Sequence, residues 1–256
     1  MTGQVQSKPA TPDGTPASAA PRPHQRQVNL FEVAYDRLEE LIVNCSLRPG
    51  QLLSIQELQG MTGLSRTPVH QAVRQLSHDT LIVIRPRNGI QIAPIDLARQ
   101  RTLLQLRKDV ESFVIRLAAE RSGPTQKNQM LHLNRAMRER RGEMDIDEFN
   151  KFDRRIDRLI LSAAGEPFLQ HTLRPLHTLF RRTGWLHHRH IAGHSSLERT
   201  IECHLAVVEA VANGRIADAV ASSDALMAFV EDMLGAMELQ MDPALLDISL
   251  EPLVPA

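Results

Sequence analysis

The segment of residues 54–75, SIQELQGMTGLSRTPVHQAVRQ, constrains the fold more than any other part of the chain. Apolar residues at helical spacing are interrupted around Gly63, and a second helical pattern begins at Ser65, whose hydroxyl suits an N-cap. Pro68 falls in the first turn of that second helix, where its missing N–H costs little. The segment therefore predicts two short helices joined by a tight turn. The expected buried positions are Ile55, Leu58, Met61, Val69, Ala72, Val73 and Leu76, and the expected outward positions are Arg66, Thr67, His70, Gln71 and Arg74.

A β-hairpin is expected directly after these two helices. The apolar run at residues 81–84 is followed by the turn sequence RPRNG and then by Ile-Gln-Ile at residues 90–92. Asn-Gly between two such runs is a strong hairpin signal. The hairpin would form a wing whose arginines, Arg85 and Arg87, can reach a phosphate or the minor groove. Residues 62–92 hold four arginines and one aspartate, so 4 − 1 gives +3, whereas the whole chain is formally neutral. Local positive charge on a winged helix-turn-helix indicates double-stranded DNA as the partner.

The rest of the chain predicts a second, all-α domain. With 256 residues and 42% hydrophobic residues, the chain is long enough for two cores. From about residue 96 onward only helical patterns occur, which gives a mainly α fold: an N-terminal winged helix-turn-helix with a small hairpin and a C-terminal helical bundle. The expected divisions are a disordered arm at 1–26, a DNA-binding domain at 27–95, an effector-binding and dimerisation domain at 96–241 and a tail at 242–256.

Several details of that bundle can be predicted. One apolar stripe is expected along the first helix of the bundle, and a helix beginning at Pro167 is expected to kink at Pro175. Residues 183–195 look irregular, and two long helices at about 196–213 and 216–241 close the domain. The expected members of the stripe are Leu103, Leu106, Val110, Phe113, Val114 and Leu117.

Composition also indicates the cellular compartment of the protein. No apolar run approaches the roughly 20 residues that a membrane helix needs, so no membrane partner is expected. The first 26 residues lack the apolar core of a signal peptide. The two cysteines, Cys45 and Cys203, have no metal-type spacing. A reduced cytoplasm fits this usage best, although the count alone leaves one disulfide open.

Three polar residues on apolar helix faces suggest a ligand site in the second domain. His204 lies inside an apolar stripe, and Asp153 and Asp157 lie one turn apart at the border of another. One imidazole and two carboxylates suit a divalent metal such as zinc, manganese or nickel. The alternative is that neighbouring arginines make the aspartates part of a solvated charged helix. The histidines at 187, 188, 190 and 194 are open to the same two interpretations, a metal tract or a solvent loop.

The residues together resemble the GntR superfamily of bacterial transcriptional regulators. The segment PGQLLSIQELQGMTGLSRTPVHQAVRQL with its wing is similar to that family's DNA-binding domain. Leu106-Arg107 with Glu111, then FDRRIDRLILSAAGEPFL, then His204, are similar to the FadR-type effector domain called FCD. The resemblance spans about residues 28–240. It implies a homodimer that binds a pseudo-palindromic operator and responds to a small effector.

The resemblance also assigns residues by position. It implies DNA contacts by Ser65, Arg66, Thr67 and Gly89. Gln56 and His70 stand where some members have DNA-contacting arginines, so the operator sequence does not transfer.

Many members of the family coordinate a metal with one aspartate and three histidines. Asp153 and His204 fill two of those places, but Asp157 and Leu226 stand where the other two histidines belong. Leucine cannot ligate, so a weak or absent metal is favoured, as in the family's acyl-ligand branch. A metal held by Asp153, Asp157 and His204 is the alternative.

The sequence thus predicts a cytoplasmic DNA-binding regulator, a dimeric repressor controlled by a small organic acid or related metabolite. The expected DNA-binding residues are Gln56, Ser65, Arg66, Thr67, His70, Arg74, Arg87 and Gly89, and the expected effector-binding residues are Arg107, Asp153, Asp157 and His204. One alternative is a metal-dependent enzyme that uses Asp153, Asp157 and His204, but no nucleophile or general base accompanies them. Another is a scaffold that binds protein through the winged domain, which the basic recognition face disfavours.

Overall fold

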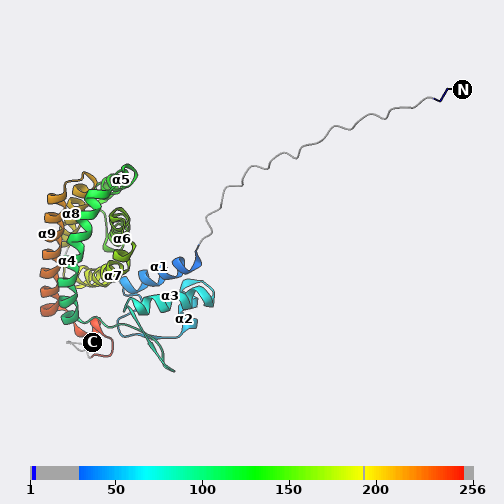
Figure 1. Cartoon of the computed structure of the whole chain (residues 1–256). Coiled ribbons are helices and arrows are strands. Elements are labelled where there is room, and N and C mark those ends of the chain that lie inside the picture. The colour runs from blue at the N-terminus through cyan, green and yellow to red at the C-terminus, as the bar shows by residue number, and fades with distance from the viewer. Residues whose placement is uncertain (1, 4–28, 193, 251–256) are drawn as a thin grey trace.

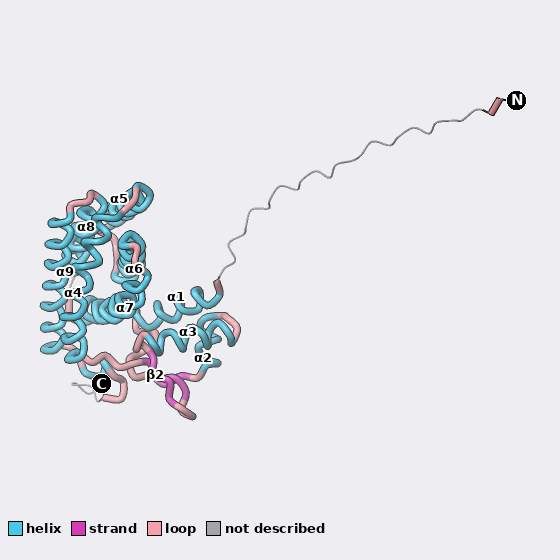
Figure 2. Tube along the Cα trace, viewed as in Figure 1, coloured by secondary structure: helices cyan, strands magenta, loops and turns pink. Residues whose placement is uncertain are grey.

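The computed structural model describes residues 2–3, 29–192 and 194–250, and it does so without the side chains of residues 194 and 195. The expected disordered arm at 1–26 lies almost wholly outside the described residues. Figure 1 shows two parts, a compact N-terminal unit and a larger helical bundle beside it. Strands occur only in the N-terminal unit among the described residues (Figure 2). The predicted fold class is confirmed.

The N-terminal unit is a winged helix-turn-helix. Its elements are α1 (Leu30–Val43), β1 (Leu52–Leu53), α2 (Ile55–Thr62), α3 (Arg66–His78), β2 (Ile82–Arg85) and β3 (Gly89–Ile92). Asn29 caps α1 through a hydrogen bond that its Oδ1 accepts from the Phe31 amide, 3.2 Å. Ser54 and Glu57 form a capping box at the start of α2, which fixes where that helix begins. Helix α1 packs against α3, and the three strands form an antiparallel sheet in the order β1-β3-β2.

One predicted core position of this unit is wrong. Leu58 is fully buried on α2 as expected, but Met61 is 51% exposed. Thr62 takes the inward place instead, because α2 continues one residue further than predicted and the left-handed turn begins at Gly63, with φ 64°. The Thr62 hydroxyl is satisfied within the helix, since it donates to the Leu58 carbonyl at 2.8 Å. On α3 all four expected core residues are buried.

The second part is the predicted helical bundle. Its elements are α4 (Leu97–Arg121), α5 (Pro124–Arg140), α6 (Ile146–Ala164), α7 (Pro167–His190), α8 (His194–Ala212), α9 (Ile216–Gln240) and the short α10 (Pro243–Leu246). Helix α4 packs against α9 and α6, while α5 packs against α8. One continuous apolar core joins these helices. None of the described helices is long and apolar enough to cross a membrane.

Two details of the bundle differ from expectation. On α4 the buried face carries Leu104, Arg107 and Glu111, whereas Leu106 and Phe113 are 48% and 51% exposed. The other four members of the predicted stripe do face the core, Val114 and Leu117 buried and Leu103 and Val110 partly buried. The apolar pattern missed Arg107 and Glu111 because they are charged and are buried as a pair. Residues 183–190 are not irregular but form the last turns of α7, which also passes through Pro175 without ending.

The chain after α9 returns to the winged unit. The Ile95 amide donates to the Leu246 carbonyl at 2.8 Å, and the Ile248 amide donates to the Pro49 carbonyl at 3.0 Å. A small apolar cluster that includes Ile95 and Met241 lies at the same junction. The described part of the expected tail, residues 242–250, therefore contacts both parts of the molecule.

Candidate DNA-reading face and effector cavity

The outer face of α3 is polar, exposed and unpaired. Arg66, Thr67, His70 and Arg74 are all exposed, as predicted. Within the described residues, none of these four side chains makes a hydrogen bond or an ion pair. Ser65 is the N-cap of α3, but its hydroxyl accepts no capping hydrogen bond, contrary to expectation. Five neighbouring side chains are thus available to an external partner.

The wing extends the same basic character. The turn places Arg87 in the left-handed region, with φ 67°, and its side chain is exposed. Arg85 is held differently, because its Nε and Nη2 both donate to Gln91 Oε1, at 3.0 and 2.9 Å.

The backbone at position 89 can be occupied only by glycine without strain. Its φ is 91°, and an added Cβ would lie 2.7 Å from the Leu53 carbonyl oxygen of β1. Gln56 is exposed near the start of α2. The DNA contacts of all these residues stay predictions.

A chain of buried charges crosses the effector bundle. Arg107 Nε lies 3.1 Å from Glu111 Oε2, and the same oxygen lies 2.8 Å from His177 Nε2. His177 Nδ1 in turn faces Asp157 Oδ2 at 3.2 Å. Burial alone would raise the pKa of Glu111, but the charges of His177 and Arg107 lower it to about 2. The carboxylate of Glu111 therefore stays ionised between two cations.

Arg181 occupies the centre of this charge chain. Its Nε donates to Asp153 Oδ2 at 2.8 Å, and its Nη2 donates to Asp157 Oδ2. The other Asp153 oxygen lies 3.1 Å from His204 Nε2, and His204 Nδ1 contacts the Thr200 carbonyl at 2.7 Å. Asp153, Asp157 and His204 lie together as predicted, but Arg181 between the two aspartates was not predicted. The one available signal was a pair of arginines inside the otherwise apolar stretch TLFRRTGWL.

The pKa values of Asp153 and Asp157 are shifted in opposite directions. Burial would raise the pKa of Asp153, but Arg181 and His204 outweigh that effect and lower it. The pKa of Asp157 is raised, first by burial and then by the charges of Asp153 and Glu111. The pKa of His204 is raised as well, because the hydrogen bond and charge of Asp153 outweigh burial. The group is a compact ionic network in which each carboxylate already has a cationic partner.

A divalent metal does not fit this arrangement. Arg181 holds one carboxylate oxygen of each aspartate, and the other oxygen of Asp153 lies 3.1 Å from His204 Nε2. Leu226, which lies near the network, has no atom that could bind a metal. Within the described residues, no group of three or more His, Cys, Asp or Glu side chains is arranged to hold a metal.

The cavity around this network is small. It measures about 60 Å³ and is lined by Arg107, Asn150, His188 and His204, among others. We call it the central cavity. Burial, together with electrostatic repulsion from His187 and His204, lowers the pKa of His188 to about 4. The Asn150 Nδ2 amide is buried without a hydrogen-bond partner, so the central cavity contains an unused donor.

The histidine tract does not form a solvent loop. His187 is buried and His188 is half-buried, both on the last turns of α7. The side chain of His194 lies outside the described part of the chain.

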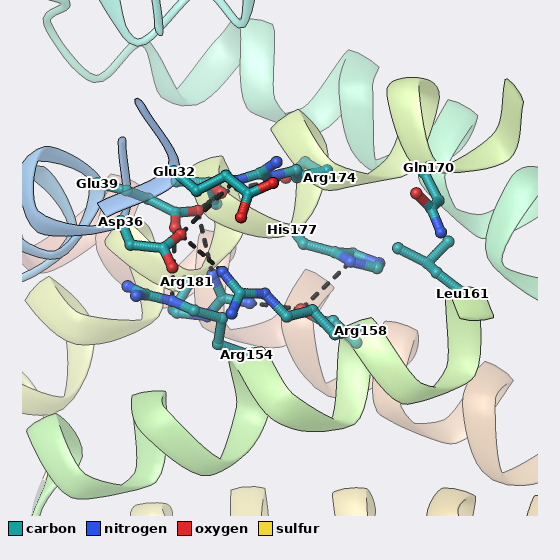
Figure 3. A pocket seen from close by; sticks show the side chains of 12 residues that line it. Glu32, Asp36, Glu39, Arg154, Arg158, Leu161, Gln170, Arg174, His177 and Arg181 are labelled. Carbon is teal, nitrogen blue, oxygen red and sulfur yellow. Dashed lines mark hydrogen bonds and ion pairs between the residues drawn. The ribbon is translucent and has the colours of Figure 1, made fainter. Parts of the chain in front are cut away.

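The ionic network continues into the winged unit. Glu39 of α1 is 2% exposed and accepts a hydrogen bond from the Thr178 hydroxyl of α7. Glu39 Oε2 lies 3.4 Å from Arg154 Nε, and Glu39 Oε1 lies 3.8 Å from Arg181 Nη1. Figure 3 shows these side chains converging between α1 and the bundle. Arg181 therefore connects the wall of the central cavity with α1 of the winged unit.

A winged helix-turn-helix with an exposed basic face, joined to a helical ligand-binding domain, defines a DNA-binding transcriptional regulator. Comparisons with known proteins agree. Residues 30–92 match the model for bacterial regulatory proteins of the gntR family, and residues 102–229 match the FCD domain. The chain belongs to the GntR family and carries an FCD domain. The enzyme alternative is set aside, because this family consists of transcriptional regulators.

Relatives and solved structures show the same architecture. The chain is 30% identical over 180 residues to the HTH-type transcriptional repressor RspR of Escherichia coli K12, covering 69% of this chain and 76% of that protein. It is 26% identical over 131 residues to an HTH-type regulator of Streptomyces ambofaciens, covering 51% of this chain and 55% of the relative. E. coli McbR/YncC matches with a TM-score of 0.71 at 16% identity over 83% of this chain and 100% of that one. A GntR regulator from Rhodococcus sp. RHA1 matches with a TM-score of 0.60 at 19% identity, over 82% and 99%. The two solved structures are similar in fold.

Proposed function

We propose that this regulator is a cytoplasmic homodimer that represses transcription from a pseudo-palindromic operator, with residues 27–95 as reading head and 96–241 as effector and dimerisation domain. The observation that carries the proposal is the unpaired basic face of α3. Arg66 and Thr67 lie at the start of that helix, where the recognition helix of such domains contacts base edges. Arg74 and Arg87 are placed to contact phosphates and so to position the head.

Dimerisation is supported by the exposed face of α4. Leu106 and Phe113 lie two turns apart on one face of α4 and are about half exposed, whereas the other exposed large apolar residues of the bundle are spread over α5, α7 and α9. Apolar residues repeated along one exposed helix face are typical of a surface that is covered in an assembly. A two-fold dimer would match the symmetry of a palindromic operator.

The proposed effector is a small organic acid in the central cavity. Arg107 and the unused Asn150 amide would bind its carboxylate, and His204 also lines this cavity. Asp153 and Asp157 would act through Arg181, which they hold. The guanidinium supplies the positive charge there, so we propose that the cavity works without a metal. An effector alters DNA binding only if it favours one arrangement of the two heads.

Selection from a random DNA pool with the full-length protein tests this function. The proposal expects enrichment of an inverted repeat whose half-sites are about 10 base pairs apart, one helical turn. Arg66→Ala should fail to enrich that repeat. Arg135→Ala is the matched control, because Arg135 is an exposed arginine on α5, far from the reading face. Enrichment of no motif by the wild-type protein would contradict the proposal.

A further inference from the structure

The largest hollow at the ionic network is not the central cavity. A cavity of about 360 Å³ lies between α1 of the winged unit and α6 and α7 of the bundle. We call it the junction cavity, and Figure 3 shows it from close by. Ligand sites for small molecules usually measure roughly 300–1,000 Å³. The junction cavity reaches this range, and the central cavity, at about 60 Å³, has room only for a smaller molecule.

Basic groups predominate in the junction cavity. Five basic and four acidic side chains line it, counting His177 among the basic ones. Three of the acidic groups, Asp36, Glu39 and Asp157, each have two basic partners, whereas Glu32 has none among the described residues. Asp36 Oδ1 lies 2.6 Å from Arg158 Nη2 and 3.7 Å from Arg174 Nη2. Glu39 is shared in the same way by Arg154 and Arg181. Because a guanidinium has five N–H donors, this sharing leaves donor capacity unused.

Two arginines at the mouth have the most unused capacity. The Arg174 side chain donates no hydrogen bond to any described residue. Its guanidinium carbon lies 4.0 Å from the centroid of the Tyr35 ring, and this stacking orients the side chain. Arg158 makes one hydrogen bond, to Asp36, and its side chain is 54% exposed. An exposed ion pair of this kind contributes little to the stability of the fold. An incoming anion can therefore replace Asp36 on Arg158 at a small cost in free energy. Deeper inside, Arg154 Nε is buried and has no hydrogen-bond partner.

The remaining wall suits a small organic body. Gln170 is exposed at the far end, and its side-chain amide makes no hydrogen bond with the described residues. Leu161 beside it is buried and apolar. Figure 3 places Arg174 above and Arg158 below the hollow, with Gln170 and Leu161 at one end. Guanidinium pairs recognise carboxylate and phosphoryl oxygens through paired hydrogen bonds.

We propose that the junction cavity is a second ligand site, separate from the central cavity, that takes a small anion with carboxylate or phosphoryl oxygens between Arg158 and Arg174. The occupant lies against α1 beside Asp36, whose carboxylate it replaces on Arg158, and it contacts α6 and α7 through the two arginines. It therefore bears directly on how the reading head sits on the bundle. Arg181 and His177 line both cavities, so occupation of one is sensed in the other.

Thermal unfolding of the full-length protein with two probes, inorganic phosphate and succinate, tests the site at ionic strength matched with sodium chloride. We expect at least one probe to raise the Tm of the wild-type protein. The Arg158→Gln/Arg174→Gln variant should lose that rise. Arg155→Gln should keep it, because Arg155 is exposed on α6 but does not line the junction cavity. Comparing the two probes distinguishes phosphoryl from carboxylate recognition.

A variant of the central cavity separates this proposal from the function proposed above. Arg107→Gln should keep the part of the rise in Tm that Arg158→Gln/Arg174→Gln removes, since Arg107 lines only the central cavity. Loss of the rise in Arg107→Gln with retention in Arg158→Gln/Arg174→Gln would overturn the second site and leave the proposed function intact. Absence of any probe effect on the wild-type protein would overturn it too. A lysine pair, Arg158→Lys/Arg174→Lys, should recover part of the rise, because it restores charge without the paired hydrogen bonds.

Discussion

Arg181→Met should be the most destabilising single substitution in the ionic network. The Arg181 side chain is 3% exposed and faces Asp153, Asp157 and Glu39. Removing one partner of a buried ion pair costs about 3–5 kcal/mol. The lower end applies here, because each carboxylate keeps another partner, such as His204 for Asp153. A loss of about 3 kcal/mol corresponds to a fall in Tm of roughly 6–12 °C for a chain of this size.

The same substitution should change the pH dependence of stability. The pKa of Asp153 is lowered in the folded protein, so its ionisation stabilises the fold above the unfolded pKa, about 3.9. That contribution is lost as the pH falls below this value. In Arg181→Met the lowering of the pKa is smaller, and the buried carboxylates are relieved by protonation. The gap in Tm between wild type and variant should therefore stay constant from pH 7 to about 4 and narrow as the pH falls below about 4.

Calorimetry or circular dichroism melts at several pH values measure both effects. Arg189→Met is the matched control, because Arg189 is exposed on the same helix and has no ion pair among the described residues. It should change stability by less than about 0.5 kcal/mol. Adding Asp153→Asn to Arg181→Met should restore part of the loss. A Tm for Arg181→Met within about 2 °C of wild type at pH 7, which is under about 1 kcal/mol, would refute the reasoning.

Two further predictions concern assembly and metal. Phe113→Asp should convert the proposed dimer to a monomer in light-scattering measurements, whereas Leu131→Asp, which alters an exposed apolar residue on α5, should not. A dimeric Phe113→Asp would place the interface elsewhere. Elemental analysis of freshly purified protein should find no stoichiometric zinc, manganese or nickel, because Arg181 holds both aspartates. A stoichiometric metal that disappears in His204→Ala would overturn the metal-free cavity.

The reading head could be predicted nearly residue by residue, because its signals are local. Helix caps, the left-handed Gly63 and the hairpin turn each act within a few residues of sequence. The errors there, such as Met61 in place of Thr62, arise where a helix ends one residue later than the pattern suggests. The apolar face of α4 was harder to predict. Its buried side carries Arg107 and Glu111, whose burial is possible only because the fold pairs them with each other and with His177.

The effector site could be predicted only in part, because its decisive contacts are distant in sequence. Spacing placed Asp153 and Asp157 on one side of α6, and the pattern put His204 inward. No local signal shows that Arg181, 24 residues beyond Asp157, lies between the two aspartates. Nor does the sequence show that Glu39 of the winged unit packs into the same network. Such contacts depend on how α1, α6 and α7 assemble.

The central claim is that the α3 face reads DNA, and a fluorescence anisotropy titration against the selected operator tests it most directly. Wild type, Arg66→Ala and Arg135→Ala are compared over a series of salt concentrations. Loss of one base-reading arginine costs about 1–3 kcal/mol per half-site, roughly a 5- to 150-fold weaker affinity. We predict that loss, or a larger one in the dimer, for Arg66→Ala and unchanged affinity for Arg135→Ala. Equal operator affinity of Arg66→Ala and wild type at every salt concentration would contradict the claim.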